Sequence, residues 1–260
     1  MCYDSEARPP VPPTPAGNAR GEDLVLTAAD GNQFNAYQAY PEHSKEAQVL
    51  IFPDVRGLHQ FYKDLALRFA EQGIGALAID YFGRTAGLTA RDDAFEFWPH
   101  VQQMKFETFQ QDVQAGLKRL REGEGANNAT FTLGFCMGGS LSLLTGTQPN
   151  LGLVGVIGFY AGLTRAMVGG KTVLEVAQDI KYPVLGLFGG ADQGIPVSAV
   201  EELKEKLTEA HIPNQIVIYP NAPHSFFDRR SAEFAEASAE AWRQVLDFIA
   251  TYTQKVEAGA

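Results

Sequence analysis

Short apolar runs alternate along most of the chain with longer amphipathic segments. The runs are continuously apolar, as in strands that helices cover on both faces, and the segments between them repeat apolar residues with helical spacing. The predicted strands cover residues 47–53, 74–80, 129–135, 151–160, 182–190 and 214–220. The predicted helices cover residues 59–72, 137–147, 197–210 and 231–252. One or two more helices are predicted between residues 91 and 122, with a break near Pro99. An irregular insertion follows the strand over residues 151–160 and extends to about residue 181. This alternation predicts an α/β fold, a mostly parallel twisted sheet with helices on both faces.

The two ends of the chain follow other patterns. Residues 1–21 contain five of the 14 prolines and little apolar periodicity, which predicts an extended arm. Residues 23–41 form two alternating runs around Asp30-Gly31-Asn32, the pattern of a β-hairpin. We therefore expect one domain over residues 22–252, preceded by the arm and followed by a short tail over residues 253–260.

Composition narrows the class of protein. A chain of 260 residues is long enough for one sizeable core, and its net charge of -10 without a cluster of Lys and Arg argues against nucleic-acid binding. No apolar run is long enough to span a membrane, and the first residues lack the basic and apolar regions of an export signal. Cys2 and Cys136 are expected to be free thiols in a cytoplasmic protein. The oligomeric state has no signal in the sequence.

Residues 134–138, Gly-Phe-Cys-Met-Gly, lie at a predicted junction between a strand and a helix. They fit the G-x-S-x-G nucleophile elbow with a thiol in place of the hydroxyl. Glycine is needed at positions 134 and 138 because the turn leaves no room for a Cβ, and a helix N-terminus favours the thiolate of Cys136. The alternative is a structural core cysteine, because free cysteine is often buried.

Two downstream residues complete a possible triad. Asp192 follows the predicted strand over residues 182–190, and His224 follows the strand over residues 214–220. The order of nucleophile, acid and histidine is that of α/β-hydrolases, and the carboxyl ends of parallel strands are where open α/β sheets build their sites. Taken singly, Asp192 also fits a helix N-cap and His224 a polar turn residue.

Other chemistries have little support. None of the remaining histidines stands in an H-E-x-x-H pattern or beside a pair of cysteines, so no metal site is predicted. The chain also lacks a G-x-G-x-x-G after a strand and a P-loop, so no cofactor is implied.

At these residues the chain resembles the dienelactone hydrolase family, the cysteine-dependent branch of the α/β-hydrolases. The segments GFCMGG, GGADQGIP and APHSF resemble that family's nucleophile, acid and histidine motifs, and IDYFGR resembles the segment after its second buried strand. The resemblance runs from about residue 22 to residue 252. It implies an α/β-hydrolase fold in which Cys136 attacks a lactone or enol-ester carbonyl, His224 transfers the proton, and Asp192 holds the imidazole tautomer.

Two backbone amides are expected to stabilise the oxyanion. One belongs to Met137, the residue after the nucleophile, and the other to Val55 in the loop after the strand over residues 47–53.

The resemblance is incomplete around the substrate. Asp54 stands where the family has a Glu beside the nucleophile, and it either modulates the thiol or is a solvated turn residue. Of two family arginines that hold a substrate carboxylate, Arg91 matches the first, although a surface arginine opening a helix is the alternative. Asp228 replaces the second and is expected to repel an anionic substrate unless Arg229 compensates.

These residues predict a carboxylic ester hydrolase that cleaves an activated ester or lactone through a thioester acyl-enzyme. A thiol acylates readily when the leaving group is good, which favours lactones and enol esters. The alternatives are a general small-ester carboxylesterase or thioesterase, and a non-catalytic relative that binds a ligand or uses Cys136 as a redox sensor.

Overall fold

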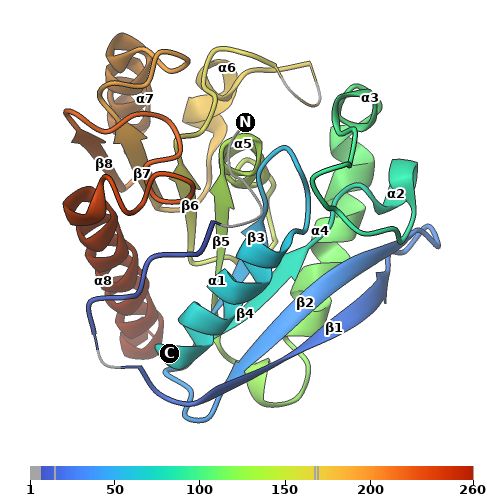
Figure 1. Ribbon diagram of the computed structural model, residues 1–260. Coiled ribbons are helices and arrows are strands. Elements are labelled where there is room, and N and C mark those ends of the chain that lie inside the picture. Colours follow the sequence, from blue (N-terminus) through green and yellow to red (C-terminus); the bar gives the residue numbers. More distant parts are fainter. Residues whose placement is uncertain (1–6, 15, 167, 169, 260) are drawn as a thin grey trace.

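An eight-stranded sheet forms the centre of the protein, in the order β1-β2-β4-β3-β5-β6-β7-β8 (Figure 1). The structure, a computed structural model, describes residues 7–14, 16–166, 168 and 170–259. The strands are β1 (Ala19–Thr27), β2 (Gln33–Pro41), β3 (Ala47–Phe52), β4 (Ile74–Ile79), β5 (Ala129–Phe135), β6 (Gly155–Phe159), β7 (Val184–Gly189) and β8 (Asn214–Tyr219). Strands β3 to β8 pair in parallel, whereas β2 pairs antiparallel with β1 and β4. The predicted hairpin and mostly parallel sheet are therefore confirmed.

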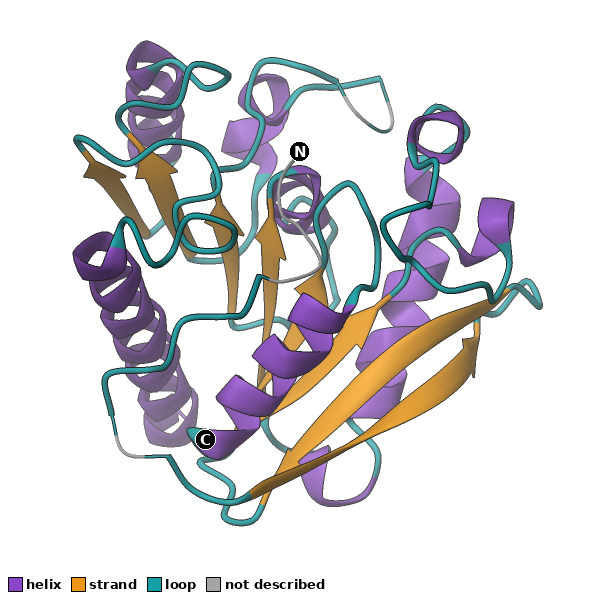
Figure 2. Cartoon of the chain, viewed as in Figure 1, coloured by secondary structure: helices purple, strands orange, loops and turns teal. Residues whose placement is uncertain are grey.

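Helices cover both faces of this sheet (Figure 2). The helices α1 (Gln60–Glu71) and α8 (Ala235–Gly259) share one face, where the ring centroids of Phe69 and Trp242 lie 4.9 Å apart. On the other face, Gln110 of α4 (Phe106–Leu120) donates a hydrogen bond to Thr145 of α5 (Met137–Thr145). The helix α6 (Val173–Val176) contacts both α5 and α7 (Val197–Glu209).

Burial explains the two patterns of the sequence. Every residue of β3, β5 and β7 is buried, which is why these strands are mainly apolar without a strict alternation. Helix α4 instead buries one stripe that includes Phe109, Val113, Leu117 and Leu120, and this spacing of three and four residues places them on one face. Burial of these apolar side chains is the main driving force for the fold.

The short elements differ from the prediction. The region over residues 91–122 divides into α3 (Trp98–Val101) and α4, with the break after α3 rather than near Pro99. Pro99 lies in the first turn of α3, where its missing N–H breaks no intrahelical hydrogen bond. The one-turn helices α2 (Gly83–Ala86) and α6 were not predicted, because a single turn has no apolar period to recognise. Helix α8 continues to Gly259 through residues expected as a tail.

The described part of the N-terminal arm forms no helix or strand before β1. Its Pro10 carbonyl accepts a hydrogen bond of 2.8 Å from Nε1 of Trp242, and its Gly17 N–H donates one of 2.7 Å to the carbonyl of Glu71. The arm therefore lies against α8 and the end of α1 (Figure 1). Cys2, expected as a free thiol, lies outside the described residues.

Candidate active site

The predicted site residues lie at one edge of the sheet. Cys136 follows the last residue of β5, and the loops after β7 and β8 carry Asp192 and His224. These three strands are parallel neighbours or near neighbours, so their carboxyl ends meet at the same edge, beside the start of α5 (Figure 1).

Cys136 sits on a strained turn between β5 and α5. Its φ of 55° and ψ of -115° are rare for a residue with a side chain, and its N–H donates a 3.0 Å hydrogen bond to the carbonyl of Phe159. A Cβ at Gly134 would lie 1.9 Å from the carbonyl oxygen of Gly138, and one at Gly138 would lie 2.1 Å from that of Pro53. Both glycines are therefore required by the close approach of the backbone, as the elbow pattern predicts.

The Asp192 carboxylate holds the His224 ring in one orientation. Its Oδ2 lies 2.6 Å from Nδ1 of His224, and its Oδ1 accepts a 2.8 Å hydrogen bond from the N–H of Gly194. The Asp192 side chain is only 2% exposed, whereas that of His224 is 33% exposed. Because Nδ1 is engaged by Asp192, a proton that the imidazole exchanges with another group passes through Nε2.

Cys136 and His224 both line a cavity of about 420 Å³. Val55 and Met137 also line it. The N–H of Met137 opens α5 and has no partner within the helix, and that of Val55 donates no hydrogen bond to another described residue. The other lining residues are Phe97, Trp98, Ser140, Gly162, Leu163, Thr164, Arg165, Gly194 and Ile195.

Two acids are buried behind this cavity rather than in it. Asp54 is 0% exposed, its Oδ1 accepts a hydrogen bond from the Arg56 N–H, and burial, with the nearby charge of Asp228, raises its pKa to about 7. Asp228 accepts a 2.7 Å hydrogen bond from the Tyr160 hydroxyl, and burial raises its pKa to about 6. The alternative of a solvated turn for Asp54 is wrong. Neither acid is among the residues that line the cavity, and the repulsion of an anionic substrate expected for Asp228 stays a prediction.

Arg91 is also buried outside the cavity. Its Nη2 lies 2.7 Å from Oδ2 of Asp80, its Nη1 donates to the carbonyl of Thr89, and its guanidinium lies 4.6 Å from the ring centroid of Phe95. Asp80 is fully buried at the end of β4 and needs an opposite charge beside it. The alternative of a surface arginine is therefore wrong, whereas the substrate contact expected for Arg91 stays a prediction.

The sequence did not single out several residues around the site. Phe97 and Trp98 line the cavity at the start of α3, where Phe97 is the N-cap residue, and this aromatic pair was visible in the segment RDDAFEFW. Arg165 lines it from the irregular segment between β6 and α6, where no pattern marked it. The Tyr160 ring packs on His224 with centroids 4.9 Å apart. The position of Tyr160 directly after the buried strand β6 was the signal in the sequence that could have placed this residue at the site.

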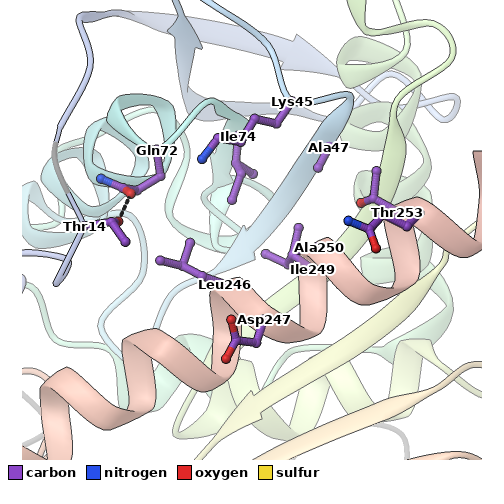
Figure 3. Close-up of a pocket in the computed structure, with 11 residues that line it drawn as sticks. Thr14, Lys45, Ala47, Gln72, Ile74, Leu246, Asp247, Ile249, Ala250 and Thr253 are labelled. Carbon is purple, nitrogen blue, oxygen red and sulfur yellow. Dashed lines mark hydrogen bonds between the residues drawn. The ribbon is translucent and has the colours of Figure 1, made fainter.

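A second cavity, of about 360 Å³, lies at the opposite edge of the sheet (Figure 3). Leu246, Ile249 and Ala250 of α8 form one side, and Ala47 and Ile74 come from the amino ends of β3 and β4. Its polar lining residues include no cysteine and no histidine. The cavity beside Cys136 is therefore the candidate active site.

Two further properties of the described part of the chain concern metal ligands and membrane-spanning helices. It contains no group of three or more His, Cys, Asp or Glu side chains that could hold a metal ion. Within the same residues, no helix combines the length and apolar composition that crossing a bilayer requires.

Comparisons with known proteins point to one family. The dienelactone hydrolase family matches residues 34–253. A protein of Methylorubrum extorquens, provisionally named carboxymethylenebutenolidase, is 30% identical over 84% of this chain and 76% of its own length. The carboxymethylenebutenolidase of Pseudomonas putida is 26% identical over 90% of this chain and 98% of its own length. Each relative is thus matched over most of its length.

Solved structures support the same fold. A provisionally named dienelactone hydrolase from Klebsiella pneumoniae superposes with a TM-score of 0.77 and 23% sequence identity. The match covers 90% of this chain and 99% of that one. At this level of identity the similarity establishes the fold alone.

Proposed function

Because the chain belongs to the dienelactone hydrolase family, we propose that it hydrolyses an activated ester or lactone with Cys136, His224 and Asp192 as a catalytic triad. The observation that carries the proposal is the 2.6 Å contact between Asp192 and His224, whose imidazole lines the same cavity as the strained Cys136. A cysteine with only a structural place in the core would need neither His224 nor Asp192.

Acylation begins with attack of the Cys136 sulfur on the carbonyl carbon of the substrate. The thiol proton passes to Nε2 of His224, and the Asp192 carboxylate stabilises the imidazolium that forms. The negative charge moves to the carbonyl oxygen, and we assign its stabilisation to the N–H groups of Val55 and Met137, a role supported by the place of both residues in the lining of the cavity.

The intermediate then collapses to a thioester. The carbon–oxygen bond to the leaving group breaks, and the imidazolium returns its proton to the departing oxygen. A water molecule, deprotonated by Nε2, attacks the thioester, and the carboxylic acid and the free thiol are released. A thiol expels an enolate more readily than a poor alkoxide, so lactones and enol esters are better substrates than simple alkyl esters.

The test compares Asp192→Asn, His224→Ala and the double variant with an activated aryl ester. Asp192→Asn is expected to lower kcat by about 10⁴, because the amide favours the wrong imidazole tautomer. His224→Ala should cost about as much, and the double variant little more than either, because the parts of one unit are not additive. The exposed Asp179 is a matched control, and Asp179→Asn should keep full activity. Additive losses from the two single changes would contradict a shared unit.

A further inference from the structure

The cavity at the amino ends of β3 and β4, opposite the candidate active site, has the size and lining of a small-molecule site. Its volume of about 360 Å³ lies within the range of ligand pockets, about 300–1,000 Å³. Leu246, Ile249 and Ala250 form an apolar stripe along α8 that faces the strand ends and continues to Thr253 (Figure 3). At 1.5 Å per residue, the stripe from Leu246 to Thr253 is about 10 Å long. The cavity therefore suits an elongated apolar chain.

One end of this cavity carries a positive charge. The Lys45 backbone N–H donates a 2.8 Å hydrogen bond to the carbonyl of Gly73, and its side chain passes over Gly73, where a Cβ would lie 2.8 Å from Cγ of Lys45. The amine reaches the cavity beside Gln72 and Ile74 (Figure 3) and forms no ion pair with another described residue. Asp247 is the one acid among the described lining residues, and its carboxylate points away from this amine (Figure 3).

Two buried polar groups of the wall lack a hydrogen-bond partner among the described residues. Gln72 is 3% exposed, and its Oε1 accepts a hydrogen bond from the Thr14 hydroxyl, whereas its Nε2 has no acceptor. Thr253 is 6% exposed, and its Oγ1 has no partner. Buried polar groups without a partner are rare because they destabilise the fold. Both side chains line the cavity, so a rotamer change, which is common on binding, would let a ligand supply the partners.

The two ends of the cavity present different groups to a ligand (Figure 3). At the Leu246 end, the ammonium of Lys45 and the free amide N–H groups of Gln72 can only donate hydrogen bonds, which favours a carboxylate. At the other end, the Thr253 hydroxyl can donate or accept, which suits a neutral hydroxyl group. The apolar stripe between the two ends favours methylene groups.

We propose that this cavity binds an elongated hydroxy acid, with the carboxylate at Lys45 and Gln72 and the hydroxyl at Thr253. A chain of about eight carbons matches the length of the stripe. Ring opening of a lactone gives a molecule of this class, but the assignment rests on the cavity and not on the hydrolase function proposed above.

The experiment measures binding by isothermal titration calorimetry with 8-hydroxyoctanoate and the neutral octane-1,8-diol, which differ only in the carboxylate. Lys45→Gln is expected to raise Kd for the acid about 5- to 10-fold, because it removes a charge-assisted hydrogen bond, and to change Kd for the diol less than about 2-fold. Lys204→Gln, at an exposed lysine of α7 outside the cavity, is the matched control and should leave both values unchanged.

Two further variants test the far end and the stripe. Thr253→Val nearly keeps the shape of the side chain and removes the hydroxyl, so it should raise Kd for 8-hydroxyoctanoate about 2- to 10-fold and leave that for octanoate unchanged. Ala250→Phe, at an exposed position of α8, should fill the cavity and weaken binding of all three ligands.

Equal effects of Lys45→Gln on the acid and the diol, or undiminished binding by Ala250→Phe, would overturn the assignment. So would the absence of binding by the unchanged protein at millimolar concentrations of the acid. None of these measurements involves ester hydrolysis, so their failure is distinguishable from a failure of the hydrolase proposal.

Discussion

At the scale of single residues, Asp54 is a carboxyl group whose buried surroundings shift its ionisation to near neutral pH. Burial raises its pKa to about 7, and its Oδ2 has no hydrogen-bond partner among the described residues. The folded state thus binds this proton more tightly than the unfolded chain, in which the pKa is near 3.8. A group with a raised pKa contributes its full stabilisation below the unfolded value, and this contribution is lost as the pH rises to the folded value.

Asp54→Asn should therefore become more stable relative to the unchanged protein as the pH rises from about 4 to about 7. The amide removes the ionisation but keeps an oxygen that accepts from the Arg56 N–H. Urea unfolding across this range measures the effect, and the exposed Asp179→Asn is the control whose relative stability should not show this trend. A relative stability of Asp54→Asn that does not change with pH would contradict the buried, protonated state.

Local sequence could predict which residues meet at the sheet edge, but not what every side chain touches. Cys136, Asp192 and His224 each follow a strand of the parallel part of the sheet that the sequence predicted, so their place follows from the parallel sheet. Arg91 and Arg165 have no such constraint. The partner of Arg91 is Asp80, a contact that no sequence spacing specifies, and Arg165 lies in a segment without periodicity.

At the scale of elements, the junction of β5 and α5 depends on backbone atoms that nearly touch. A Cβ at Gly138 would lie within 2.2 Å of two carbonyl oxygens, those of Pro53 and Phe52, and neither belongs to a flexible side chain. The turn that carries Cys136 therefore requires the backbone at the end of β3 to lie close to the backbone that follows β5.

Gly138→Ala is expected to lower the free energy of unfolding by roughly 3 kcal/mol or more, because backbone must move to admit the methyl group. Gly75→Ala in β4 is the matched control, since its Cβ would meet its nearest atom, Cβ of Gln48, at an ordinary 3.6 Å. Denaturant unfolding compares the two. Similar stabilities of the two variants would mean that the elbow tolerates a side chain.

The long elements were predictable and the short ones were not. Buried strands such as β3 and β7 can be recognised in the sequence by runs of mainly apolar residues, and α4 by its apolar stripe. The one-turn helices α2 and α6 lack any period, and the described side chains over residues 254–258 near the end of α8 are exposed, so no apolar stripe marked these residues as helix.

At the scale of the whole molecule, the described part of the N-terminal arm contacts α1 and α8, the two helices that share one face of the sheet. Besides the Trp242 and Glu71 hydrogen bonds, its Ala7, Pro9 and Pro12 are buried. No described residue of the arm lines the cavity beside Cys136. The contacts of the described part of the arm are therefore with α1 and α8 and not with the cavity.

Deletion of residues 1–12 should lower the free energy of unfolding by about 1–3 kcal/mol, the scale of one lost hydrogen bond and some apolar burial, and leave KM unchanged. Val11→Ala, at a side chain that is 65% exposed, is the control and should keep the original stability. Thermal unfolding and steady-state kinetics on both variants measure the two effects. An unchanged unfolding temperature after the deletion would show that the arm contacts add no stability.

The most direct test of the central claim is mass spectrometry of the protein quenched with acid during turnover of an activated aryl ester. A thioester mechanism predicts an added mass equal to the acyl group, located on the peptide that contains Cys136 and removed by hydroxylamine. His224→Ala should accumulate less of this adduct in the same time, because acylation loses its base. An acyl group on any other residue, or undiminished hydrolysis by Cys136→Ala without an adduct, would contradict the mechanism.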